Sequence, residues 1–220
     1  MDELLELTLF IIVIFGFLIL INERLGTSHR HLHGIIRDSV RSHWGLQEFL
    51  RLPRSQRKIG KWFMFSEQTV YSMGHKFTGR FDQAVLHWGK SPILDLMIER
   101  KFPVSHLPMK RRDEDLFQAA LYSLALMESG VSCSSSRLVV IYCLQNQAKR
   151  CLKRTRGLEC FKCGAGRVFH EPFSQRTVLS TLERLDEVWY NGRRPIPDPS
   201  FDKCMRCQFS RNGSCQYTLA

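Results

Sequence analysis

The chain has 220 residues, enough for one good-sized domain, and its hydrophobic fraction of 44% argues against an intrinsically disordered protein. It carries 32 Lys and Arg residues against 21 Asp and Glu residues, which gives a net charge of +11. This excess predicts a polyanionic partner, either nucleic acid or an anionic membrane surface. The alternative is a basic protein that its charge only keeps soluble.

The N-terminal segment predicts a membrane anchor over residues 1–23. From Leu4 to Ile21 the only charge is Glu6, and a helix of this length spans roughly 27 Å, close to the hydrocarbon thickness of a bilayer. The acidic start and the lack of a small-residue cleavage site favour a retained single-pass anchor over a cleaved signal peptide. Basic residues collect on the cytoplasmic side, so we expect the body of the protein in the cytoplasm. Those that follow the apolar run are Arg24, Arg30, Arg37 and Arg41.

Residues 24–60 are expected to form a juxtamembrane segment with one amphipathic helix over 35–50, "IIRDSVRSHWGLQEFL". Two β-prone runs follow, "RFDQAVLHW" and "PILDLMIERK", joined at the Gly/Pro-containing turn 89–92. This pattern predicts a β-hairpin. Because side chains alternate between the two faces of a strand, Glu99 and Lys101 are expected to point the same way, roughly 6–7 Å apart along the strand.

The second half of the chain alternates helix and strand patterns. Residues 113–130 predict a helix with acids in its first turn and a stop at Gly130. Gln118 and Tyr122 are four residues apart and therefore share one face of that helix. The apolar run 136–144 predicts a buried strand, and 175–192 predicts an amphipathic helix. We expect an α/β core over residues 61–200, with a mixed central sheet flanked by helices, and a Cys-rich tail over 201–220.

An aspartate in one strand and a Glu-x-Lys in its neighbour indicate a metal site. Hard cations such as Mg²⁺ and Mn²⁺ prefer carboxylate oxygens and water, so Asp82 and Glu99 are candidate ligands. The metal lowers the pKa of bound water, and Lys101 beside it can orient that water or stabilise phosphorane charge. This chemistry cleaves a phosphodiester. The alternative is a salt bridge at the end of a strand.

Eight cysteines in a chain with a cytoplasmic body are expected to stay reduced or to bind metal. Two Cys-x-x-Cys pairs, Cys160–Cys163 and Cys204–Cys207, are typical of a structural zinc site. Three late cysteines with one remote cysteine would instead suit an iron–sulfur cluster. We predict one metal centre that uses Cys204 and Cys207 and draws its other ligands from Cys215, Cys160 and Cys163. The alternative is a set of unrelated thiols, as we expect for Cys133, Cys143 and Cys151.

A run of cations, here called the basic segment, precedes the first Cys-x-x-Cys pair. Such a run is often a solvated surface, but beside a nuclease site it indicates a track for phosphates. Its members are Lys149, Arg150, Lys153, Arg154 and Arg156.

Together these motifs resemble the PD-(D/E)XK nucleases, in particular the RecB-like branch and its CRISPR-associated single-strand exonuclease relatives. "GRFD", "IERK", "QAALY" and the late cysteines occur in the family's order over residues 75–217. The resemblance implies a restriction-endonuclease-like core in which Asp82 and Glu99 bind Mg²⁺ or Mn²⁺ and Lys101 is catalytic. It implies that Gln118 and Tyr122 contact DNA or support the site, and that the late cysteines hold an iron–sulfur cluster.

The family also implies a histidine ligand on an early helix, for which His33 is the candidate and His43 competes. The chain departs from the family in having no cysteine before Cys133. We expect a membrane-anchored, metal-dependent DNA exonuclease of RecB-like type that acts on DNA that is single-stranded or has free ends. The alternatives are a catalytically silent nucleic-acid-binding module with a Cys-bound metal, and a membrane adaptor that binds anionic lipid.

Overall fold

The computed structural model describes residue 14, residues 32–151, residue 160 and residues 163–219. The anchor expected over 1–23 therefore lies outside the described residues, except for residue 14. Among the residues described, no helix is both long enough and apolar enough to cross a membrane. The chain divides into two compact units, Met1–Val178 and Leu179–Ala220, with the division inside the helix α5. The domain boundaries expected from the sequence stay a prediction.

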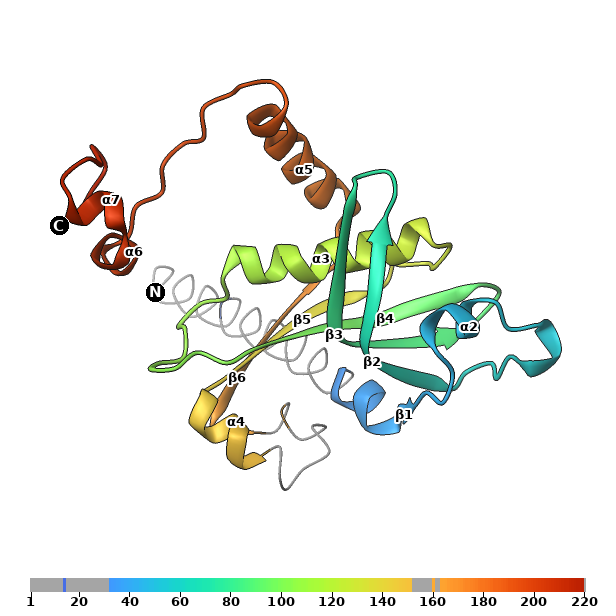
Figure 1. Ribbon diagram of the computed structural model, residues 1–220. Helices are drawn as coiled ribbons and strands as arrows, with labels where there is room; N and C mark the ends of the chain where they lie inside the picture. Colours follow the sequence, from blue (N-terminus) through green and yellow to red (C-terminus); the bar gives the residue numbers. More distant parts are fainter. Residues whose placement is uncertain (1–13, 15–31, 152–159, 161–162, 220) are drawn as a thin grey trace, which may run out of the picture. The chain divides into compact units, whose positions relative to one another are not determined.

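The first unit is built around a mixed sheet of six strands in the order β1-β2-β3-β4-β5-β6 (Figure 1). The strands β2 to β4 form an antiparallel meander, β5 runs parallel to β4, and β6 runs antiparallel to β5. The expected α/β fold with a mixed sheet and flanking helices is confirmed. The strands are β1 (Val40–Arg41), β2 (Trp62–Ser72), β3 (Phe77–Trp88), β4 (Pro92–Lys101), β5 (Arg137–Cys143) and β6 (Gly166–Pro172).

The helix α3 (Asp113–Glu128) connects β4 to its parallel neighbour β5 and covers one face of the sheet (Figure 1). Its first turn carries Asp113, Glu114 and Asp115, which complement the positive end of the helix dipole. The helix stops before Gly130, whose φ of 88° suits glycine. The expected hairpin, this helix, the buried strand β5 and the amphipathic helix α5 (Gln175–Trp189) are all confirmed.

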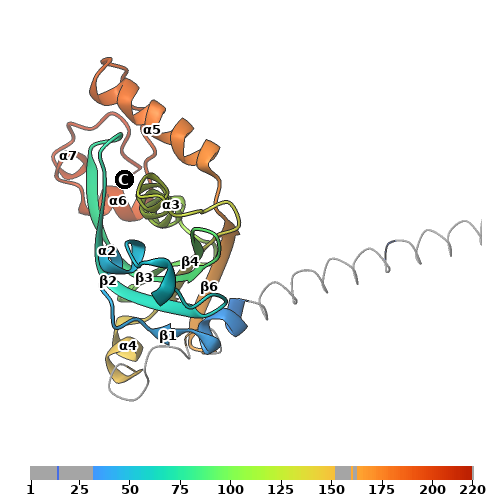
Figure 2. The ribbon, with the colours of Figure 1, turned by 90° about the vertical axis from the view of Figure 1, so that its right-hand side faces the viewer.

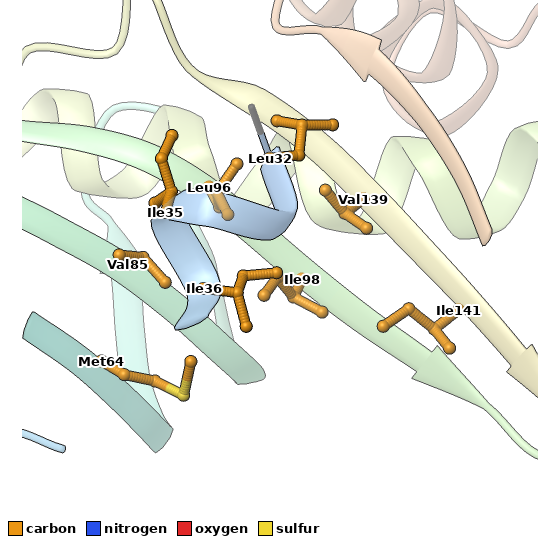
Figure 3. Close-up of a cluster of buried hydrophobic side chains, with 9 residues drawn as sticks. All are labelled: Leu32, Ile35, Ile36, Met64, Val85, Leu96, Ile98, Val139 and Ile141. Carbon is orange, nitrogen blue, oxygen red and sulfur yellow. The ribbon is translucent and has the colours of Figure 1, made fainter. Parts of the chain in front are cut away.

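The opposite face of the sheet is covered by a helix at residues 32–38, as Figure 2 shows. Its apolar side chains pack against alternate residues of the central strands (Figure 3). The buried cluster consists of Leu32, Ile35, Ile36, Met64, Val85, Leu96, Ile98, Val139 and Ile141. Because Leu96 and Ile98 face this helix, Glu99 and Lys101 lie on the face that α3 covers.

The single helix expected over residues 35–50 is wrong. The helix ends at residue 38, and the chain then forms β1, which pairs in parallel with β2. A new short helix, α2 (Leu46–Leu50), starts after its N-cap residue Gly45. The amide of Ser42 donates to the carbonyl oxygen of Met64 at 2.9 Å. This hydrogen bond to the sheet takes the place of the one that a continuous helix would make. This pairing with residues 23 positions later in the chain leaves no signature in local periodicity.

The remaining helices are short. A 3-10 turn occupies Arg54–Gln56, and α4 (Gln145–Cys151) follows β5. The second unit contains most of α5, then α6 (Phe201–Arg206) and α7 (Gln208–Arg211). Among its described side chains only Cys204 and Ser210 are buried. This unit therefore has little apolar core of its own.

One close contact fixes the distance between β3 and α3. A Cβ atom placed on Gly79 would lie 2.5 Å from Cε1 of Tyr122. Gly79→Ala should therefore lower the free energy of unfolding by about 1–3 kcal/mol, since either the ring or the strand must move. Urea denaturation measures this loss. The control is Gly164→Ala in an exposed turn, where a Cβ meets nothing within 4 Å, and it should change stability by less than about 0.5 kcal/mol. Equal losses in both variants would contradict the contact.

Candidate active site

The strands β3 and β4 part at the position of the candidate acids. Their ladder ends at the pair Gln83–Ile98; beyond it β3 pairs only with β2, and β4 only with β5. Asp82 and Glu99 are the next residue on each strand. The amide of Arg100 donates to Oδ2 of Asp82 at 2.6 Å, so the carboxylate takes the place of a ladder carbonyl. The sheet thus opens where the two acids lie.

Lys101 is the centre of a polar cluster on the face that α3 covers. Its ammonium donates to Oε1 of Glu99 at 2.9 Å and to Oε1 of Gln118 at 2.6 Å, and it lies 3.5 Å from Oδ1 of Asp115. The expected common orientation of Glu99 and Lys101 is confirmed. Lys101 is the last residue of β4, and its ammonium contacts Gln118 and Asp115 of α3, so it ties the helix to the end of the strand.

Gln118 and Tyr122 continue this network along α3. The amide nitrogen of Gln118 donates to the hydroxyl oxygen of Tyr122 at 2.8 Å, as expected for residues one helical turn apart. The same Gln118 accepts from Lys101 through its oxygen, so its orientation is determined by both partners. Tyr122 is buried and its ring contacts Phe81 of β3. The structure therefore brings Glu99, Lys101, Gln118 and Tyr122 into one chain of contacts.

Glu99 is 4% exposed, which is unusual for a carboxylate. Its pKa is raised to about 7, mainly by burial and additionally by the charges of Asp82 and Asp115, while the hydrogen bond and the charge of Lys101 act in the opposite direction. Only one of its oxygens meets Lys101. Among the described residues, the buried Oε2 has no hydrogen-bond partner. A buried carboxylate oxygen without a partner is costly and calls for a ligand.

The donors fit a hard divalent cation. Mg²⁺ is bound through one or two carboxylates and keeps several waters, so Asp82 and Glu99 suffice as protein ligands. The partnerless Oε2 of Glu99 is the atom available to it. Over the described ranges, no three His, Cys, Asp or Glu residues are grouped closely enough to hold a metal by themselves. Any cation here would therefore depend on water for most of its ligands.

Two residues of the cluster were not expected from the sequence. Asp115 was assigned only to the helix dipole, but it also lies 3.5 Å from Lys101. Its Oδ2 accepts from the hydroxyl of Tyr142 at 2.6 Å, and burial together with this hydrogen bond raises the pKa of that phenol to about 12. Tyr142 lies opposite Lys101 in the β4–β5 register. The sequence signal that could have placed Asp115 in the cluster was its spacing, because it precedes Gln118 by three residues and therefore shares its face of the helix.

The two candidate histidines lie elsewhere. His33 belongs to the helix at residues 32–38, which packs on the sheet face opposite α3, and its charge acts on Asp38. His43 is exposed between β1 and α2, and its ring lies tilted against that of Trp44 with 3.7 Å between centroids. The structure does not bring either of them to Asp82 and Glu99. The assignment of a histidine ligand was drawn from resemblance, and the local fold gives it no support.

The other expected groups are described in part. Lys149 and Arg150 of the basic segment are exposed on α4, and its other three members lie outside the described residues. Cys160 and Cys163 are half-buried in the first unit. Cys204 is buried in the second, with Cys207 and Cys215 half-buried. A joint centre made from both sets stays a prediction.

Comparison of the chain with models of known protein families gives no match, and comparison with curated proteins gives no match either. The assignment of the cluster therefore depends on its own geometry and chemistry.

The raised pKa of Glu99 predicts how stability depends on pH. Between about pH 4.5 and pH 7 the folded state binds the Glu99 proton more tightly than the unfolded state, so the free energy of unfolding falls as pH rises. Glu99→Gln removes this titration while keeping an acceptor for Lys101. With chelator present, the variant should gain on the order of 2–3 kcal/mol relative to the natural protein between pH 5 and pH 8. Urea denaturation across this range measures the gain. A difference that does not change with pH would mean that Glu99 is solvated.

Proposed function

We propose that the chain is a metal-dependent DNA nuclease of the PD-(D/E)XK superfamily, similar to the RecB-like and CRISPR-associated single-strand exonucleases. The observation that carries the proposal is the cluster at the parted ends of β3 and β4. There a buried glutamate with one partnerless oxygen lies beside Asp82 and contacts Lys101. A surface salt bridge would not require the burial of Glu99 or the contacts of Lys101 with α3.

Asp82 and Glu99 would hold one Mg²⁺ or Mn²⁺ ion. When bound, the ion supplies Lewis acidity and a water of lowered pKa for attack on phosphorus. The protein holds Glu99 ready for this role, because its raised pKa places it near the point of ionisation at neutral pH. A cation beside Oε2 favours the ionised form and offsets the cost of burying it.

Lys101 acts as a charged hydrogen-bond donor. Burial lowers its pKa, but the hydrogen bond and charge of Glu99 and the charge of Asp115 outweigh burial, so the pKa is raised. The ammonium form therefore persists at neutral pH, and Lys101 is not a general base. Its position beside Glu99 suits it to stabilise negative charge that develops on a phosphate oxygen. Gln118 and Tyr122 are positioning residues that hold the ammonium in place.

The proposal extends to the two ends of the chain. Residues 1–23 would anchor the protein in a membrane by one helix, with the catalytic unit in the cytoplasm. Cys204, Cys207 and Cys215 would provide thiolates for an iron–sulfur cluster or a zinc ion, and a metal would give the second unit the cohesion that its few buried side chains do not provide. DNA that is single-stranded or has free ends is the proposed substrate.

Alanine substitution of the cluster tests the proposed reaction. Asp82→Ala, Glu99→Ala and Lys101→Ala should each lower Mn²⁺-dependent cleavage of labelled DNA at least about 100-fold, because each removes a ligand or the charge donor. Binding of DNA in chelator should change little.

The matched control is Glu183→Ala, which removes an exposed acid from α5 and should cleave at the natural rate. Cleavage at the natural rate by any of the three site variants would remove that residue from the site. Full-length natural protein that binds DNA but cuts neither single- nor double-stranded substrate would favour the silent binding module.

The basic segment should bind phosphates. Changing its five members to Gln should weaken DNA binding and reduce the slope of log K against log salt by up to about 4 if each contacts one phosphate. Fluorescence anisotropy over a salt series measures the slope. An unchanged slope would mean that the segment is only solvated. The control changes five exposed cations elsewhere in the first unit, namely Arg51, Arg54, Lys58, Lys61 and Lys90.

A further inference from the structure

The loop at residues 102–112 begins and ends at the candidate active site. It leaves β4 directly after Lys101 and leads into the first turn of α3. The contact of Lys101 with Asp115, at 3.5 Å, closes the loop at its base. Figure 1 shows the loop between the end of β4 and the start of α3. Both ends of the loop therefore lie beside any substrate that reaches Lys101.

Hydrogen bonds from neighbouring elements hold the backbone of this loop. The first residue of α4 donates its amide to the carbonyl oxygen of Pro103 at 3.0 Å. The guanidinium of Arg167 on β6 donates to the carbonyl oxygen of Pro108 at 2.8 Å. The amide of Arg112 donates to the hydroxyl oxygen of Tyr142 on β5 at 3.1 Å. Because these bonds come from three different elements, the loop has a defined path next to the site.

The same loop leaves three large apolar side chains in solvent. Phe102 is 45% exposed, Val104 is 78% exposed and Met109 is 80% exposed. Single exposed apolar residues are ordinary on a protein surface, but a group of them beside a candidate active site indicates a binding surface. Since the backbone of the loop is already held, a ligand that covers these side chains would have to order little additional chain.

Cations accompany the apolar side chains. Lys110 and Arg112 are exposed, and neither forms an ion pair with an acid of the described residues, whereas Arg111 between them is paired with two acids. The helix α4, whose first residue contacts Pro103, also carries the exposed cations of the basic segment. Apolar and positively charged side chains thus alternate at this end of the first unit. Single-stranded DNA has the complementary pattern, because it presents the apolar faces of its bases between anionic phosphates.

We infer that the loop at residues 102–112 binds the unpaired bases of single-stranded DNA that enters the site. This rests on the proposed function and names the part of the chain that contacts the bases. The three apolar side chains of the loop pack against base faces, which in a duplex are stacked on one another. Side chains such as Phe and Met insert between bases in this way in proteins that unstack DNA. Lys110 and Arg112 hold the neighbouring phosphates.

Two oligonucleotides of equal length test the inference by binding alone. One is single-stranded DNA, and the other carries the same phosphates on abasic sugars. Fluorescence anisotropy measures the affinity of the full-length protein for each, in detergent and chelator. The natural protein should bind the strand with bases at least about 10-fold more tightly. The loop variant, with Phe102→Ser, Val104→Ser and Met109→Ser together, should reduce this ratio to about 2, because it keeps the phosphate contacts. The three side chains are exposed, so the fold should remain intact.

The matched control changes three exposed apolar side chains elsewhere in the first unit, Ile59→Ser, Tyr71→Ser and Met73→Ser, and should keep the natural ratio. A second variant, Lys110→Gln with Arg112→Gln, should weaken the binding of both oligonucleotides by similar factors.

Equal affinity of the natural protein for the two oligonucleotides would overturn the inference. So would a loop variant that keeps the natural ratio, which is the result expected if the loop contacts a membrane surface instead. Because chelator prevents metal-dependent cleavage, the outcome does not depend on catalysis. A protein that distinguishes the two oligonucleotides through this loop but cuts no DNA would support the inference and contradict the proposed nuclease.

Discussion

The candidate site depends on one ion pair at the end of β4, between the buried Glu99 and the half-buried Lys101. Its two partners sit two residues apart on the same face of a strand, so backbone geometry brings them together without help from distant sequence. A buried pair is stabilising only where further polar contacts compensate for lost hydration. Lys101 has such contacts with Gln118 and Asp115, whereas Glu99 has one oxygen without any partner among the described residues. Lys101 therefore has polar contacts that compensate for its lost hydration, whereas one oxygen of Glu99 still lacks a hydrogen-bond partner.

This asymmetry connects the fold to the proposed chemistry. The sheet parts at Asp82 and Glu99, which leaves the facing edges of β3 and β4 unpaired there, and α3 is held against this part of the sheet by Lys101 and by the contact of Tyr122 with Gly79. A core glutamate with a pKa near 7 and a partnerless oxygen destabilises the metal-free protein. Such a loss of stability at one residue is typical of groups that bind a ligand and do not serve to stabilise the fold.

Features with a local cause were predictable from the sequence. The hairpin followed from its turn residues, α3 from its acidic start and glycine stop, and the shared face of Glu99 and Lys101 from the period of a strand. Features that depend on long-range pairing were not. The pairing of β1 with β2 interrupts an apparently helical pattern, and β6 is half-buried along most of its length, so it lacks an apolar signature. Asp115 was missed because an acid in a first helical turn already had a sufficient explanation.

The proposed reaction requires a divalent cation at Oε2 of Glu99, and crystallography with manganese tests this directly. Crystals of the protein soaked in Mn²⁺ and measured at the manganese absorption edge should give an anomalous peak in contact with the carboxylates of Glu99 and Asp82, with water completing its shell. The same peak should be absent from Glu99→Gln crystals. A peak elsewhere, or no peak at saturating Mn²⁺ with Glu99 well ordered, would contradict the account.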